Sequence, residues 1–189
     1  YSYSTLGPQN GSRARLLYVE TGLPYLASSS SQYRSYRTWL ADLRWYQKLT
    51  PRSLIALRLY GEINGGRDAL PGWIGGPESV RGYDYFQFAG RWVGFSNLEL
   101  RFPLIDHLQL AVPPMSLGNI RGALFVDAGT VTDGWETFSL MRDLRLSTGL
   151  GFRWDLGFTL LKVDLVRPFD LQQGWTGPWF TQFSLGPEF

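Results

Sequence analysis

The sequence predicts an all-β protein, an antiparallel up-and-down transmembrane β-barrel with eight strands in this chain. Three observations support this prediction. Apolar and polar residues alternate with a period of two, turn-forming residues interrupt the alternation about every ten to twenty residues, and aromatic residues make up 16% of the 189 residues. The sequence has no apolar run near the roughly 18 residues that a spanning helix requires.

Eight segments carry the alternating pattern. Each is long enough to cross a bilayer as a tilted strand, which takes roughly 9 to 11 residues. We expect strands at residues 12–21, 33–47, 52–64, 91–102, 118–128, 143–155, 157–167 and 178–189.

The connections between these strands alternate in length. Residues 47–52 and 154–157 form short turns, whereas residues 65–90, 129–142 and 168–177 form long loops. Short periplasmic turns and long external loops are typical of outer-membrane barrels, so we expect both termini on the periplasmic side. The connection from Pro103 to Leu117 does not fit, because it is long where a short turn is expected.

The alternation also assigns the two faces of the strands. In the fourth segment Leu98 and Leu100 share one face, while Glu99 and Arg101 share the other. We expect the apolar face to contact lipid and the charged face to line the interior. A soluble sandwich would reverse this arrangement, and alternation alone does not separate the two. Tryptophans near the strand ends favour the membrane, because indoles concentrate at its interfaces.

Composition argues against several classes of function. The chain has no cysteine and a net charge of +2, so we expect neither a thiolate metal site nor a nucleic-acid partner. His107, the single histidine, lies near Ser116 in one connection, but the sequence has no nucleophile motif, metal-ligand spacing or phosphate loop. We therefore expect no enzyme, no metal and no cofactor.

The glycine-rich loop at residues 65–90 is the most informative segment. It contains Gly75 and Gly76 and then the sequence V-R-G-Y, which includes Arg81, Gly82 and Tyr83. The glycines would allow the loop to fold compactly, because they tolerate positive φ and close backbone approach. If this folding buries Arg81 away from water, its charge would need carboxylate partners. The alternative is an arginine solvated on an exposed loop.

Four motifs in sequence order resemble the BamA/TamA superfamily of outer-membrane assembly and secretion proteins. They are the V-R-G-Y loop, N-L-E-L-R-F-P with Glu99, F-V-D-A-G with Asp127 and Gly129, and G-L-G-F-R-W with Gly149, Gly151 and Arg153. The resemblance is strong over residues 52–189. It implies that the loop folds back toward the lumen, where Arg81 pairs with Glu99 or Asp127.

The C-terminal segment resembles the signal by which outer-membrane barrels are recognised during assembly. Phe183, Leu185 and the final Phe189 alternate with other residues, so we expect them on one face of the last strand. An ordinary edge strand would show the same pattern.

The resemblance implies a function in inserting or translocating polypeptides at the outer membrane. Its partners would be outer-membrane lipid and either other barrel-assembly or secretion subunits or a second copy of the chain. The alternatives are a passive barrel or accessory subunit of a larger complex, and a secretion pore of the two-partner type. We expect one barrel domain over residues 1–189, without a POTRA domain.

Eight strands enclose an interior that side chains fill, so a long loop would not fit inside a closed barrel of this size. Either the strands belong to a larger wall or the loop caps the outer mouth.

Overall fold

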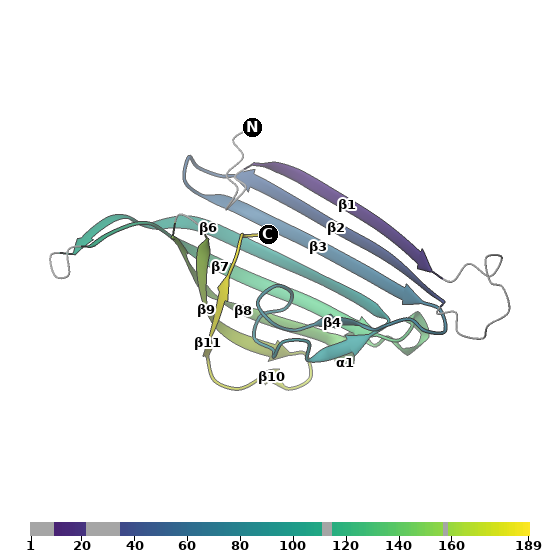
Figure 1. Ribbon diagram of the computed structural model, residues 1–189. Helices are drawn as coiled ribbons and strands as arrows, with labels where there is room; N and C mark the ends of the chain where they lie inside the picture. Colours follow the sequence, from purple (N-terminus) through teal and green to yellow (C-terminus); the bar gives the residue numbers. More distant parts are fainter. Residues whose placement is uncertain (1–9, 22–34, 111–114, 157–158) are drawn as a thin grey trace.

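The computed structural model describes residues 10–21, 35–110, 115–156 and 159–189, and the side chains of residues 106–110 and 115–119 lie outside this description. Within these ranges the chain is almost entirely β-structure (Figure 1). The strands are β1 (Gly11–Thr21), β2 (Tyr36–Lys48), β3 (Leu54–Gly65), β4 (Gly72–Ile74), β5 (Phe88–Gly90), β6 (Trp92–Leu110), β7 (Met115–Thr132), β8 (Leu144–Asp155), β9 (Leu160–Asp170), β10 (Gly174–Trp175) and β11 (Phe180–Leu185). A 3₁₀ turn (Trp135–Thr137) and a short helix α1 (Leu140–Asp143) lie between β7 and β8.

The long strands form one curved antiparallel sheet in the order β1-β2-β3-β6-β7-β8-β9, and β10 and β11 both pair with β9. Neighbouring long strands follow one another in sequence, which is an up-and-down arrangement. Within the described residues the sheet is open, because β1 pairs only with β2 and β11 only with β9. The two edges of the sheet are therefore β1 and β11.

Each of the eight expected strands overlaps one observed strand, namely β1, β2, β3, β6, β7, β8, β9 or β11. Most ends differ by a few residues, and the largest difference is the end of β6 at Leu110 instead of residue 102. Three short strands were not expected, namely β4 and β5 inside the 65–90 loop and β10 after β9.

The expectation of a long irregular connection from Pro103 to Leu117 is wrong. Both β6 and β7 continue into this segment and pair as far as Leu110 and Met115. Pro103 is accommodated by a shift of register between Pro103 and Ile105, and proline in a sheet is usually found at such irregularities. The extended hairpin passes beyond Leu54, where β3 begins, and projects from one end of the sheet (Figure 1).

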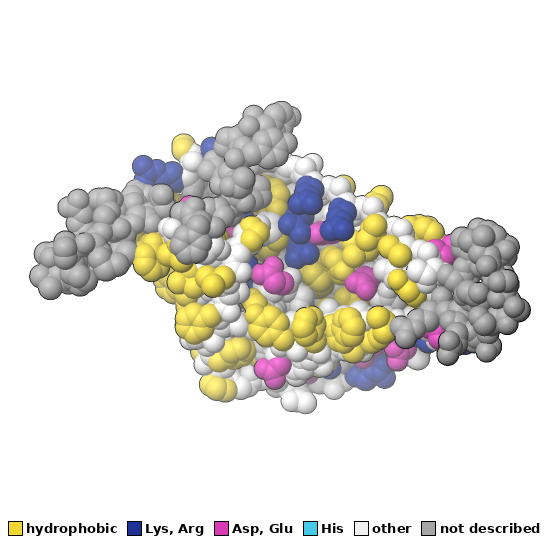
Figure 2. Space-filling model, in the orientation of Figure 1, with side chains coloured by type: hydrophobic (Ala, Val, Ile, Leu, Met, Phe, Trp, Pro, Cys, Tyr) yellow, Lys and Arg dark blue, Asp and Glu magenta, His cyan; other side chains and the backbone are white. Residues whose placement is uncertain are grey.

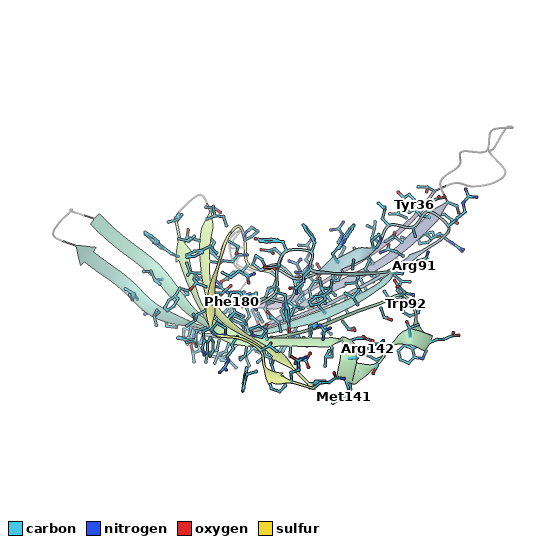
Figure 3. All side chains as sticks on the ribbon, turned by 90° about the horizontal axis from the view of Figure 1, so that it is seen from below. Tyr36, Arg91, Trp92, Met141, Arg142 and Phe180 are labelled. Atoms are coloured by element: carbon cyan, nitrogen blue, oxygen red, sulfur yellow. The ribbon has the colours of Figure 1, made fainter. Side chains whose placement is uncertain are left out.

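The long loops meet at the opposite end of the sheet. Tyr36, Arg91 and Trp92 mark this end, and Met141 and Arg142 of the loop between β7 and β8 lie nearby (Figure 3). The start of β1 and the end of β11 lie at the other end, where β2 turns into β3.

The two faces of the sheet have opposite character, as the alternation predicts. On β6, Leu98 is 47% exposed whereas Glu99 is 2% exposed, and on β8, Phe152 is 45% exposed whereas Arg153 is 1% exposed. Charged side chains lie on the concave inner face and leucines cover the outer face. A water-soluble sheet would bury the apolar face, so this distribution fits a sheet whose outer face meets hydrocarbon.

The loop between β3 and β6 covers part of the inner face. Strands β4 and β5 form a small hairpin, and Ile74 and Val80 pack against Val93 and Phe95 of β6. Tyr60, Tyr83, Phe88 and Val131 pack around this apolar core. The loop is therefore docked on the inner face of the sheet, at β6 and β7.

Replacing Leu98 by arginine tests the orientation of the sheet. Because Leu98 lies at the middle of the outer face of β6, Leu98→Arg should destabilise the protein in phospholipid vesicles by about 2–4 kcal/mol. The matched control is Ser12→Arg, at the exposed end of β1, where the cost should be about 0–1 kcal/mol. Chemical unfolding in vesicles measures both free energies, and equal values for the two variants would contradict the assignment of the outer face.

Candidate functional site

Arg81 lies at the centre of the docked loop, between β4 and β5, and its side chain is only 3% exposed. The loop turns this side chain toward the inner face of β6 and β7. A guanidinium removed from water in this way must be neutralised, because an unpaired buried charge costs several kcal/mol.

Asp127 on β7 holds Arg81 with three hydrogen bonds. The Nε and Nη2 groups of Arg81 donate to the two carboxylate oxygens at 2.7 Å each, and the backbone N–H of Arg81 also donates to Oδ2 at 3.1 Å. Only arginine offers this planar fork to a carboxylate.

Glu99 on β6 is the second partner of Arg81, with its Oε1 atom 2.6 Å from Nη1. Burial alone would lower the pKa of Arg81, but the carboxylates of Asp127 and Glu99 outweigh burial and raise that pKa above its ordinary value. The guanidinium is therefore held in its charged form, and the structure brings it together with both of the carboxylates named from the sequence.

Two further contacts of Arg81 were not anticipated. Asp164 on β9 lies 3.8 Å from Nη1, and the ring of Phe125 lies 3.5 Å beneath the guanidinium carbon. Apolar and charged residues alternate in β9, and this alternation places Asp164 on the inner face. The sequence therefore contained a pattern from which Asp164 could have been predicted as a partner of Arg81. Phe125 stands two residues before Asp127 in the same motif, and therefore on the same face of β7.

Arg153 and Arg101 extend this arrangement across the inner face. Arg153 donates to Asp164 at 2.6 Å and lies 3.6 Å from Glu99, while Arg101 donates to the other oxygen of Glu99 at 2.8 Å. Glu99 thus contacts three guanidinium groups and Asp164 contacts two.

Glu188 completes the group from the end of the chain. It lies 3.2 Å from Arg101, 3.5 Å from Arg121 and 3.8 Å from Arg153. No local pattern predicts the position of Glu188, because that position depends on the turn at Gly186, where φ is +137°.

The charged residues described above form one group with Lys162 and Glu78, whose side chains lie 2.7 Å apart. We call this group the charge cluster. Its cations are Arg81, Arg101, Arg121, Arg153 and Lys162, and its anions are Glu78, Glu99, Asp127, Asp164 and Glu188. The two signs balance. The cavity among these side chains is 20 Å³, about the size that one water molecule occupies, so the cluster fills this part of the inner face.

The expectation that Phe183, Leu185 and Phe189 share one face is wrong for Phe189. Phe183 and Leu185 are 63% and 65% exposed on the outer face of β11. The chain turns at Gly186, and Phe189 packs on the inner face against Tyr46, Leu54 and Ala56 of β2 and β3, and against the guanidinium of Arg101. The last residues therefore reach from β11 across to the opposite part of the sheet.

The glycines of the loop have the conformation that the docking requires. Gly75, Gly76 and Gly82 all have positive φ, between 93° and 116°. A Cβ at Gly75 would lie 2.2 Å from the carbonyl oxygen of Asp84, so a side chain there is excluded by space as well as by conformation.

The strand glycines named from the motifs leave room for the buried groups around Arg81. A Cβ at Gly129 would lie 2.4 Å from Val80, one at Gly149 would lie 2.5 Å from the ring of Phe125, and one at Gly151 would lie 2.4 Å from the carboxylate of Asp164. The three glycines lie on the inner face, directly beneath the docked loop or the charge cluster.

Gln182 on β11 ties the loop to the last strand, and it was not anticipated. Its side-chain oxygen accepts a hydrogen bond from the backbone N–H of Gly82, and its side-chain nitrogen donates to the carbonyl of Tyr83, both at 3.3 Å. The Tyr83 hydroxyl donates to the carbonyl of Leu146 on β8 at 3.1 Å. The V-R-G-Y segment thus contacts four strands, from β6 to β9, as well as β11.

The chemistry of the charge cluster suits a structural role. Its members are arginines, a lysine and carboxylates that neutralise one another, and the described residues contain no group of His, Asp or Glu side chains suited to a metal ion. Within the same residues no helix is long and apolar enough to cross a membrane. The side chains of His107 and Ser116 lie outside the described part of the chain.

Comparison with known proteins gives one family. A family model described as the Omp85 superfamily domain matches residues 4–189. No curated protein matches the chain.

Removing the guanidinium of Arg81 should destabilise the folded protein. We expect Arg81→Ala to lower the free energy of unfolding by about 3–5 kcal/mol, because it leaves Asp127 and Glu99 buried with fewer partners. Arg81→Lys should recover only part of this loss, since an ammonium does not form the fork. Urea unfolding of the protein in detergent measures the change, with Arg67→Ala, whose side chain is 76% exposed, as the control. Wild-type stability in Arg81→Ala would show that the cluster does not hold the loop.

The pairing of Arg81 with Asp127 can be measured by a double-mutant cycle. Asp127→Ala should cost about as much as Arg81→Ala, and the double variant should lose less than the sum, with a coupling of about 1–3 kcal/mol. Additive losses would show that the two side chains act independently.

Gly149→Ala tests the packing beneath Arg81. The added Cβ would lie 2.3 Å from the carbonyl oxygen of Leu165 and 2.5 Å from the ring of Phe125, so we expect a loss of about 1–3 kcal/mol of stability. Gly61→Ala is the control, because a Cβ there meets no atom within 4 Å. Similar values for both substitutions would indicate that strand propensity, and not the lack of space at Gly149, sets the cost.

Proposed function

Because this chain belongs to the Omp85 superfamily, we propose that it acts in the insertion of polypeptides into the outer membrane or in their translocation across it. The superfamily consists of outer-membrane β-barrel proteins that work as assembly factors and transporters and not as enzymes. The match confirms the resemblance drawn from the motifs and, with the curved antiparallel sheet, the expected barrel fold.

The observation that carries the proposal is the position of the docked loop. It covers the inner face at β6 to β9, whereas Arg13 and Arg15 on the inner face of β1 are exposed. Basic and acidic side chains gather in the middle of the face seen in Figure 2, with hydrophobic side chains around them. Strands β6 to β9 are thus braced by the loop, while the inner face of β1 is accessible.

In the mechanism that we propose, the exposed inner face of β1 and the edge strands receive the substrate. An extended segment would pair its backbone with a free strand edge, which needs neither a nucleotide nor a cofactor. Arg81 and the charge cluster would keep β6 to β9 in one shape while the edge exchanges partners. Arg81, Gly82, Tyr83, Glu99 and Asp127 are in this proposal the residues that stabilise the wall.

We also propose the orientation of the protein. Residues 1–189 would form one barrel domain, with the turns after β2 and β8 and both termini on the periplasmic side. The loop that carries Arg81 would then enter the wall from the outer surface. Lipid would contact the leucines of the outer face.

Reconstitution tests the proposed function. Liposomes that contain the wild-type protein should assemble a small unfolded outer-membrane protein faster than empty liposomes, and the heat-dependent mobility of the folded substrate on a gel measures the rate. Arg81→Ala should lower this rate, because the wall beside the receiving edge loses its brace, whereas Arg67→Ala should not. Equal rates with and without the wild-type protein would exclude insertion and favour an accessory role.

A further inference from the structure

The outer face of the sheet carries a groove near the long loops. Its volume is about 620 Å³. Its floor is one row of small residues that the register aligns across β2, β3, β6 and β7, namely Ala41, Gly61, Gly94 and Thr130. Each of these four strands pairs with a neighbour on both sides, so the floor lies within the sheet and not at an edge.

Large apolar side chains form the wall of the groove on the side of the loops. Trp39, Ile63 and Trp92 lie opposite one another in the next row of the register, and Trp92 marks the loop end of the sheet (Figure 3). Trp135 and Phe138, between β7 and β8, stack with their ring centroids 5.9 Å apart and also line the groove. Because tryptophan concentrates where a membrane meets water, the floor lies just inside the hydrocarbon.

Two glycines of the floor leave space that the described residues do not fill. A Cβ at Gly61 would meet no atom within 4 Å, and one at Gly94 would lie 3.9 Å from its nearest neighbours, whereas Gly129 and Gly149 have atoms at 2.4 Å and 2.3 Å. Glycine inside a strand weakens it and marks a bulge, a bend or the close approach of another group. The pairing of β3 with β6 continues without a shift through Gly61 and Gly94, so the close approach of another molecule accounts for these two glycines.

The surface of the groove is apolar and continuous with the face that meets lipid. Leu43 and Leu59 form the row on the other side of the floor and are 42% and 45% exposed. Glu62 is the one charged residue among the described residues that line the groove, and its carboxylate accepts hydrogen bonds from Tyr60 and Asn64 on the inner face. The backbone groups of the floor are paired in the sheet, so the groove offers its occupant apolar contact.

We propose that this groove binds one acyl chain of a membrane lipid, which lies across β2, β3, β6 and β7 beneath Trp39 and Trp92. The volume falls in the range of roughly 300–1,000 Å³ that is usual for small-molecule sites. A protein partner fits less well, because the floor has neither a free backbone group nor a charge for it to recognise. The proposal is independent of the proposed function, since it depends only on the outer face of the sheet.

Native mass spectrometry of the full chain in detergent tests the proposal. The probe is dioleoyl phosphatidylcholine, added in increasing amounts, and the spectrum counts the lipid molecules that stay bound to the protein. The wild-type protein should retain one lipid at concentrations at which further lipids are lost.

The variant Gly61→Leu/Gly94→Leu fills the groove. It should bind the retained lipid more than about tenfold more weakly, because each methylene group that loses its contact weakens binding roughly fourfold. The matched control is Ser96→Leu/Ala128→Leu, which adds two leucines at paired positions on the outer face outside the groove and should retain the lipid. The heat-dependent mobility of each variant on a gel verifies its folding.

A second pair of variants opens the groove instead of filling it. Trp39→Ala removes part of the wall and should weaken retention of the lipid at least about fourfold. Trp45→Ala is its control, because Trp45 lies on the same face of β2, is 44% exposed and does not line the groove.

Three outcomes would overturn the proposal. They are equal retention of lipid by the wild-type protein and Gly61→Leu/Gly94→Leu, an equal loss in Ser96→Leu/Ala128→Leu, and a dimer of the wild-type chain that disappears when the groove is filled. The second would identify lipid spread over the whole outer face, and the third would identify a contact between two copies. The liposome assay is separate, because a protein that does not insert polypeptides can still retain this lipid.

Discussion

The contact between Arg81 and its carboxylates is the interaction on which the rest of this structure depends. A buried guanidinium is tolerated only when its charge is neutralised and its N–H groups have acceptors, and Asp127 and Glu99 meet both conditions. These acceptors stand on adjacent strands, so a single side chain fixes the position of the loop relative to β6 and β7. The glycines, the ring of Phe125 and the apolar core around Val80 are arranged around this contact.

The sequence predicted the strands well because their cause is local. Alternation along a strand is a property of neighbouring residues, and it located the seven long strands and β11 as well as the inner position of Glu99. The extended β6–β7 hairpin was missed because Pro103 and the two prolines at 113 and 114 indicate an irregular connection, whereas the sheet absorbs Pro103 in a shift of register.

The partners that the sequence did not predict come from distant parts of the chain. Gln182 and Glu188 reach the loop and the charge cluster through the path of β11 and the turn at Gly186, and no local pattern encodes that path. Phe189 was placed on the wrong face for the same reason, since alternation fails where the strand ends at Leu185. The strands could be predicted from residues adjacent in the sequence, but the ion pairs between distant parts of the chain could not.

The contribution of Glu188 has a consequence for the order of folding. Arg101 lies on β6 and Glu188 lies beyond β11, so the two are far apart in the sequence and meet only when the segment after β11 has folded onto the inner face. Before that segment arrives, Arg101, Arg121 and Arg153 lack one of their carboxylates, so the interior carries excess positive charge. The charge cluster therefore reaches neutrality only when β11 has been added to β9, and an incompletely assembled wall remains electrostatically distinct from a finished one.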